Sequence, residues 1–288
     1  MKKTIAFVLL LGGLAVFYYQ FSERARQSES VPEGVEPPWS AEQQEPDEPL
    51  IRHPIPEVIP QTKVPTGAET ENQDAATVPE TAEPAPESGP VLALPGLDES
   101  DGPVVQEFAR LFPGRELGEL FYPETIIRRF VVTVDNLPRE KLPRSKYIFM
   151  RPVGGRLLVT GEDDPVYIET ENYRRYTPFV ALVDAIEPSA VVAVYVRLYP
   201  LFQKAYEDLG YPTAYFNDRL IDVIDHLLAT PEVAGPIRLV RPRVLYQFAD
   251  PALESLSAGQ KILLRIGPDN AALIKAKLRE LRQALASE

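Results

Sequence analysis

Cysteine is absent from the 288 residues of this chain. Its absence excludes disulfide bonds, thiolate metal sites, a cysteine nucleophile and a lipid anchor attached to cysteine. Only two histidines are present, which limits both metal binding and proton transfer. The sequence also lacks a glycine-rich phosphate-binding loop and the G-x-S-x-G motif of serine hydrolases. Few of the common catalytic chemistries therefore have the residues that they need.

Acidic side chains outnumber basic ones by 42 to 30, and the negative charge is unevenly placed. The formal net charge is -12, and residues 31–90 hold 13 acidic side chains against one arginine and one lysine. The part of the chain that follows is close to neutral. Because the chain has no strongly basic patch of the kind that binds phosphate backbones, we expect no nucleic-acid partner.

An apolar run opens the chain. Residues 4–21 are apolar except for Gln20, and eighteen helical residues span about 27 Å, near the lower limit for a bilayer. A cleaved signal peptide is the alternative, but bulky residues follow Ala15, where a signal peptide turns polar. We therefore expect residues 1–21 to be a transmembrane signal anchor. Two basic residues flank each side, so charge alone does not set its orientation, and the free amino terminus favours an N-terminus inside the cell.

Residues 22–90 are expected to form a disordered, acidic and proline-rich linker. Residues 31–90 contain 13 prolines and few large apolar side chains, so burial cannot offset the entropy of ordering. His53 lies in this linker, within IRHPIPEVIP, and we expect a histidine without fixed partners to have no catalytic role. A docking role for that short apolar stretch is the alternative.

Residues 91–288 have the composition of one folded domain that is long enough to bury a substantial core. Apolar spacing predicts helices over 104–112, 123–137, 172–186, 188–210, 216–231, 257–267 and 270–285. Short strands are expected within 147–169, around a turn at Gly154 and Gly155, and within 237–251. Ser257 and Gln260 have the spacing of a capping box. The predicted fold class is α+β, a mainly helical domain with small β-hairpin sheets.

An aromatic stripe marks the predicted helix over residues 188–210. Its members fall at i, i+4, i+7 and i+11, and they are Tyr195, Tyr199, Phe202 and Tyr206. A stripe of this kind usually faces the core, and an open platform for stacking sugars is the alternative.

The stretch FNDRLIDVIDHLLATP, residues 216–231, gathers three aspartates and a histidine. At 100° per residue, Asp218, Asp222, Asp225 and His226 share one side of a helix, and apolar residues take the other. We interpret them as a solvated polar face, on which Asp222 and His226 pair at i, i+4 and stabilise the protonated imidazole. The alternative is a catalytic or metal site. No other histidine exists in the domain to complete one, so we predict no catalytic residue, metal or cofactor.

Two basic groups are candidates for binding an anionic partner. One is a positive stripe at i, i+4 and i+7 of the last helix, and the other is an arginine pair between two tyrosines, suited to stacking and charge contacts. The residues of this possible binding surface are Tyr173, Arg174, Arg175, Tyr176, Lys275, Arg279 and Arg282. The alternatives are a solvated face for the stripe and bridging to nearby acids for the pair.

Several long stretches of the domain resemble an uncharacterised bacterial family known as domain of unknown function 3014. They are NYRRYTPFVALVDAI, YPLFQKAYEDLGYP, YFNDRLIDVIDHLLATPEV and LYQFADPALESLSAGQKILLRIGPDNAA, and the resemblance covers about residues 95–285. It implies a single-span protein of the bacterial inner membrane, with a proline-rich segment after the anchor and the C-terminal domain in the periplasm. It implies no activity, cofactor or catalytic residue.

The expected function is a non-enzymatic binding or scaffold domain, held at the inner membrane by residues 4–21. Its partner would be a protein or glycan polymer of the cell envelope. The alternative is a carboxylate-dependent hydrolase of envelope glycan (peptidoglycan), with Asp218, Asp222, Asp225 and His226 at its site.

Overall fold

The computed structural model describes residues 51–56, 94–111, 121–142, 147–151, 153–161, 165–185 and 187–286. The predicted anchor and most of the predicted linker lie outside these residues. The helices are α2 (Asp101–Leu111), α3 (Ile126–Asn136), α4 (Glu171–Arg174), α5 (Thr177–Asp184), α6 (Pro188–Asp208), α7 (Phe216–Leu228), α8 (Pro251–Glu254), α9 (Ala258–Arg265) and α10 (Pro268–Leu285). The strands are β1 (Val159–Thr160), β2 (Val166–Ile168), β3 (Arg238–Val240) and β4 (Gln247–Phe248).

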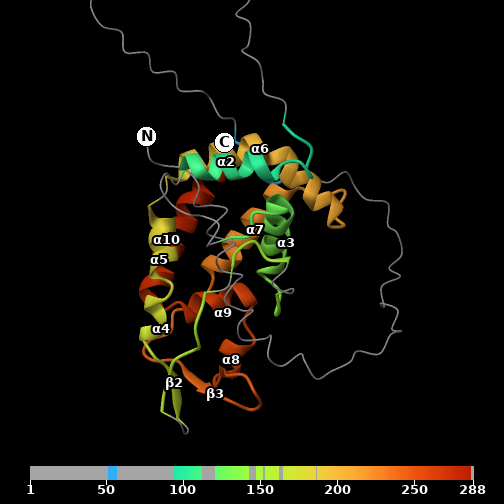
Figure 1. Ribbon diagram of the computed structural model, residues 1–288. Coiled ribbons are helices and arrows are strands. Elements are labelled where there is room, and N and C mark those ends of the chain that lie inside the picture. The colour runs from blue at the N-terminus through green and yellow to red at the C-terminus, as the bar shows by residue number, and fades with distance from the viewer. Residues whose placement is uncertain are drawn as a thin grey trace, which may run out of the picture.

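The longer helices form a bundle with a small sheet at one end. Figure 1 shows α2 and α6 crossing the end of the bundle opposite to β2 and β3. Helix α10 packs against α5, α6 and α7, while α3 packs against α6 and α7. Among the described residues, no single helix is long and apolar enough to cross a bilayer, and α5 with α6 would qualify only as a pair bent by 85°.

The strands form one antiparallel sheet rather than separate hairpins. Its order is β1-β2-β3-β4, and β2 pairs with β3 through Val166 opposite Leu239, from distant parts of the chain. The chain bends at Gly155 as predicted, with a φ of 97°, but β1 and β2 both follow this bend instead of lying on either side of it. The β1–β2 pair and the β3–β4 pair join into one sheet because each pair alone is too short to bury its apolar face. Together they enclose a second, smaller core of Val166, Ile168, Ile237, Leu239, Phe248 and Leu264.

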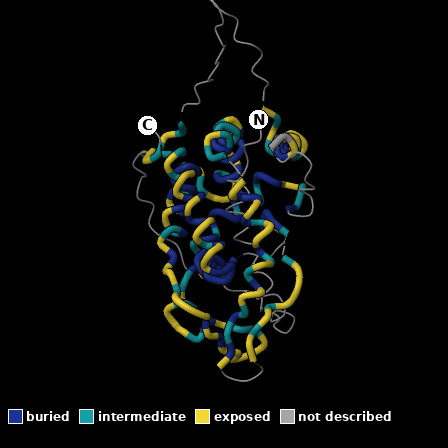
Figure 2. The backbone as a smooth tube through the Cα atoms, turned by 90° about the vertical axis from the view of Figure 1, so that its left-hand side faces the viewer, coloured by how far each residue is buried: buried dark blue, intermediate teal, exposed yellow. Residues whose placement is uncertain are grey.

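The main core lies between the helices and is rich in aromatic rings. Figure 2 shows the buried residues gathered inside the bundle and the exposed ones on its outer side. The Phe130 ring lies 5.3 Å from Phe202 and 6.2 Å from Phe216, measured between centroids. All four side chains of the predicted aromatic stripe are buried on α6. The interpretation of that stripe as core is therefore confirmed.

Most helices match their predicted ranges, and the differences at their ends have local causes. Helix α3 begins at Ile126 and not at Pro123, because Asp101 accepts the N–H groups of Thr125 and Ile126 at 2.6 and 2.8 Å. The predicted helix over 172–186 is divided into α4 and α5, and Pro178 near the start of α5 has no N–H to continue a longer helix.

Candidate functional site

The polar face of α7 binds residues 51–56 of the predicted linker, called the linker segment below. The Asp218 carboxylate accepts the main-chain N–H of Arg52 at 3.2 Å and that of His53 at 2.7 Å. The Asn217 amide donates to the His53 carbonyl oxygen at 2.9 Å. His53 therefore has fixed partners for its main chain, contrary to expectation, and the docking alternative holds for this segment.

Charge and apolar contact add to the main-chain bonds. The Arg52 guanidinium donates to both carboxylate oxygens of Asp222, at 3.0 and 2.7 Å. This paired geometry is the strong form of an arginine–carboxylate contact. The hydrogen bond and charge of Asp222 raise the pKa of Arg52, so the arginine stays charged. Ile55 packs against the main core.

The groups that hold the segment are themselves fixed by the core. The Tyr195 hydroxyl donates to Asn217 Oδ1 at 3.1 Å, and burial raises the pKa of this tyrosine well above its ordinary value. The hydroxyl therefore remains a donor, and it orients the amide so that Nδ2 faces His53. Asp218 is only 7% exposed, so the expectation of a fully solvated face is wrong at this position. Asn217, Asp218 and Asp222 together are called the α7 cradle below.

The remaining acid and the histidine of this face bind other helices. Asp225 accepts from the guanidinium of Arg282, with one contact at 2.9 Å. His226 Nε2 lies 2.8 Å from Ser257 Oγ. The predicted pairing of Asp222 with His226 is therefore wrong. Burial, and secondarily the charge of Arg219, lowers the pKa of His226, so the imidazole is neutral at neutral pH rather than protonated.

The contact of Ser257 with His226 resembles two members of a catalytic triad and lines an open groove of about 800 Å³. An acyl-transfer site also needs N–H groups free to bind an oxyanion. The first two N–H groups of α9 bond the carbonyl oxygens of Arg139 and Leu137, at 2.8 and 2.9 Å. The third bonds Ser257 Oγ at 3.2 Å, within the predicted capping box. The pair therefore joins α7 to α9, and the first three N–H groups of α9 are already bonded within the domain.

The basic residues of α10 do not form a continuous exposed stripe. Lys275 is buried, and its Nζ donates to the Thr230 carbonyl oxygen at 2.6 Å. Arg282 pairs with Asp225, and Arg279 is exposed. The predicted binding stripe is thus reduced to one exposed residue and one that is bound to α7.

The arginine pair before α5 also has internal partners. Arg174 pairs with Glu171 at 3.0 Å, as the bridging alternative predicted. Arg175 donates to the carbonyl oxygens of Gly154 and Arg156, the latter at 2.7 Å. Arg175 therefore orders the loop before β1 instead of reaching outward.

The two tyrosines that flank this pair are largely covered. Tyr176 is buried in the main core. The Tyr173 ring packs so closely on Gly267 that a Cβ there would lie 2.4 Å from the ring. Tyr173 also lines a cleft of about 440 Å³, formed with the loop at residues 230–237 and with α9 and α10. Tyr176 therefore offers no open face for stacking a sugar, and Gly267 covers part of the Tyr173 ring.

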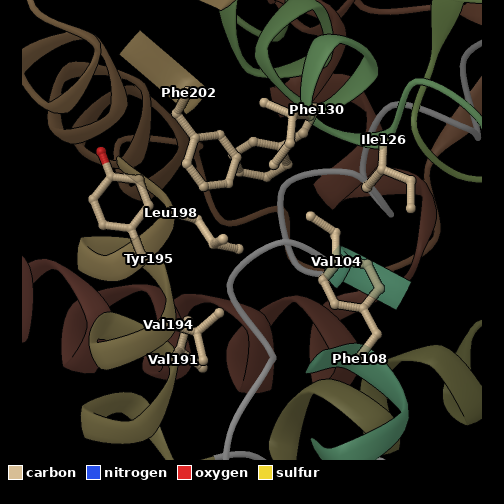
Figure 3. A pocket seen from close by; sticks show the side chains of 10 residues that line it. Val104, Phe108, Ile126, Phe130, Val191, Val194, Tyr195, Leu198 and Phe202 are labelled. Atoms are coloured by element: carbon tan, nitrogen blue, oxygen red, sulfur yellow. The ribbon is translucent and has the colours of Figure 1, made fainter. Parts of the chain in front are cut away.

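A small apolar cavity lies where α2, α3 and α6 meet. Its volume is about 10 Å³, which is at the lower limit for one water molecule. Figure 3 shows the side chains that line it, with the Tyr195 hydroxyl pointing away from the others. The cavity is a packing gap in the core and not a ligand site. In the part of the chain that the structure describes, no three histidine or acidic side chains gather to hold a metal.

The match to a known family covers the part of the chain that contains α7. Proteins of unknown function (DUF3014) match over residues 126–282, more than half of the chain. The chain belongs to the DUF3014 family. The family region begins at the first residue of α3 and includes the whole α7 cradle, whereas the linker segment lies outside it. No curated protein and no solved structure matches the chain.

Arg52 and Asn217 are the residues of this DUF3014 site that the sequence pattern alone did not single out. One signal was present, because Arg52 is the only arginine within residues 31–90 and stands in the short apolar stretch IRHPIP.

Proposed function

We propose that this DUF3014 protein is a non-enzymatic binding protein of the bacterial envelope, anchored in the inner membrane by residues 4–21. Its folded domain would lie in the periplasm and hold a partner protein near the membrane. The observation that supports a binding role is the docked linker segment, since α7 uses its polar side chains to hold the main chain of a peptide. A peptide occupant favours a protein partner over a glycan.

The rival function is hydrolysis of envelope glycan. It needs a protonated acid beside the leaving group and a second carboxylate that activates a water molecule or attacks the sugar. Asp218 accepts two main-chain N–H groups, while Asp222 and Asp225 each bind an arginine. Carboxylates whose oxygens are occupied by such donors are not placed to give a proton to a substrate. The contacts of α7 thus support binding and weigh against this rival.

The proposed location can be tested through the absence of cysteine. Ala276 is exposed on α10, so Ala276→Cys creates a single labelling site in a full-length chain that has no other thiol. A maleimide that cannot cross the inner membrane should label it in cells whose outer membrane has been permeabilised. Labelling only after lysis would place the domain in the cytoplasm and overturn this part of the proposal.

The proposed role can be tested with the purified full-length protein and with crosslinking in cells. We expect no soluble fragments to be released from purified peptidoglycan. We also expect a defined envelope protein to be crosslinked to the full chain but not to a control that ends at residue 90. The hydrolase would be established instead if the wild-type protein released fragments, Asp222→Asn abolished this release, and the exposed control Asp208→Asn did not change it.

A further inference from the structure

We infer that the α7 cradle is a recognition site for a peptide in which an arginine is followed, after one residue, by proline and an apolar residue. Residues 51–56 of the same chain are its resident ligand. This inference rests on the proposed binding function and names the class of ligand. Neither the family match nor the composition of α7 assigns such a site.

The contacts to the main chain select a peptide that bends at Arg52 and His53. Asp218 accepts two successive N–H groups, and Asn217 donates to the carbonyl oxygen of the second residue. The next residue is Pro54, which has no N–H to leave unpaired and which disfavours helix at the residue before it. Proline at this position therefore restricts the free peptide, which loses less entropy on binding.

The contacts to side chains select the sequence. The Arg52 guanidinium matches the two oxygens of Asp222, a geometry that a lysine ammonium cannot reproduce. Ile55 reaches the edge of the main core, where a polar residue would lose its hydration without gaining a partner. Arginine and the apolar residue thus occupy two different parts of the site, three positions apart.

The cradle is fixed before a ligand arrives. Asn217 is 1% exposed and bonded to Tyr195, and both aspartates project from a helix whose opposite face is buried. The segment and α7 are separated by more than 160 positions in the chain, so local chain geometry does not force the contact. These features describe a preformed peptide site that part of the linker fills.

The test uses a labelled synthetic peptide of residues 48–58 and the full-length protein in detergent, with fluorescence anisotropy as the readout. In the wild-type chain the resident segment has an effective concentration on the order of millimolar, so a micromolar peptide should bind poorly. A chain carrying Arg52→Glu and Ile55→Asp should release the segment and bind the peptide at least tenfold more tightly. Adding Asp222→Asn to that chain should remove the gain, whereas adding Asp208→Asn should leave it unchanged.

Two further peptides test the side-chain preferences. Replacing the peptide's arginine with lysine should weaken binding several-fold, and a scrambled peptide should not bind. Equal binding of the peptide to the wild-type chain and to the chain carrying Arg52→Glu and Ile55→Asp would overturn the inference. Peptide binding that the added Asp222→Asn does not reduce would also overturn it. The inference would likewise be overturned if the chain carrying Arg52→Glu and Ile55→Asp unfolded at the wild-type temperature but did not bind the peptide.

Hydrogen exchange provides a second readout that needs no released variant. The N–H groups of Arg52 and His53 should exchange slowly in the wild-type chain and quickly in Asp222→Asn. Fast exchange in both chains would contradict a resident ligand. If the peptide fails to bind but the crosslinked envelope protein is still recovered, the proposed binding function stands and only the assignment of the α7 cradle is lost.

Discussion

Replacing Gly259 with alanine should destabilise the domain, although alanine is the better helix former. Gly259 lies in α9 where this helix crosses the end of α3, and its N–H bonds the Leu137 carbonyl oxygen at 2.9 Å. A methyl group there would lie 2.6 Å from Leu227 Cδ2 and 3.1 Å from that oxygen. Leu227 is fully buried, so its side chain has no space into which it can turn.

Two opposing effects set the size of the change. Alanine gains up to about 1 kcal/mol of helix propensity over glycine. Forcing a methyl group into a closely packed contact costs about 1–3 kcal/mol, and here one contact atom is a main-chain oxygen that cannot rotate away. The packing cost should exceed the gain, leaving a loss of about 1–2 kcal/mol in the free energy of unfolding. The melting temperature should then fall by roughly 2–8 °C.

Thermal unfolding followed by circular dichroism checks this, with Gly102→Ala as the matched control. Gly102 lies in α2, and a Cβ there would have no atom within 4 Å. Its replacement should leave the melting temperature unchanged or raise it slightly. If Gly259→Ala melts at or above the wild-type temperature, α9 and α3 do not approach as closely as described and the reasoning is refuted.

Other side chains give predictions that separate buried from exposed contacts. Asp135→Ala removes the buried partner of Arg219 and should cost about 3 kcal/mol in urea unfolding, whereas Asp208→Ala, at an exposed ion pair, should change little. Because burial lowers the pKa of His226 below 6.5, unfolding takes up a proton, and stability should fall as the pH drops below about 6.5. His226→Gln should lack this component, and identical pH profiles for the two chains would contradict it.

The features that could be predicted from the sequence depend on residues close together in the chain. The capping box needs only Ser257 and Gln260, three positions apart, and the aromatic stripe of α6 lies within one helix. The start of α3 could not be predicted, because Asp101 caps it from 24 positions away. The single sheet was missed for the same reason, since each hairpin is local but their pairing is not.

The candidate site shows the same difference between features that depend on nearby residues and features that depend on distant ones. Helical geometry correctly placed Asp218, Asp222 and His226 on one side of α7. The partners of these side chains could not be predicted from helical geometry, because Asp222 binds an arginine that is 170 positions away in the chain. The polar face of α7 was expected to be exposed to solvent, whereas part of it contacts the linker segment.

If residues 4–21 anchor the chain in a membrane as proposed, docking of the linker segment would also limit how far from that membrane the domain could work. The linker of residues 22–90, at about 3.1 Å per residue, could reach roughly 210 Å, but residues 22–50 alone could reach only roughly 90 Å. The residues between the docked segment and the domain then lie between two points of attachment and add nothing to this radius. A partner peptide that displaced residues 51–56 would then more than double the distance available to the domain, so occupancy of the α7 cradle would be coupled to the distance between the domain and its proposed anchor.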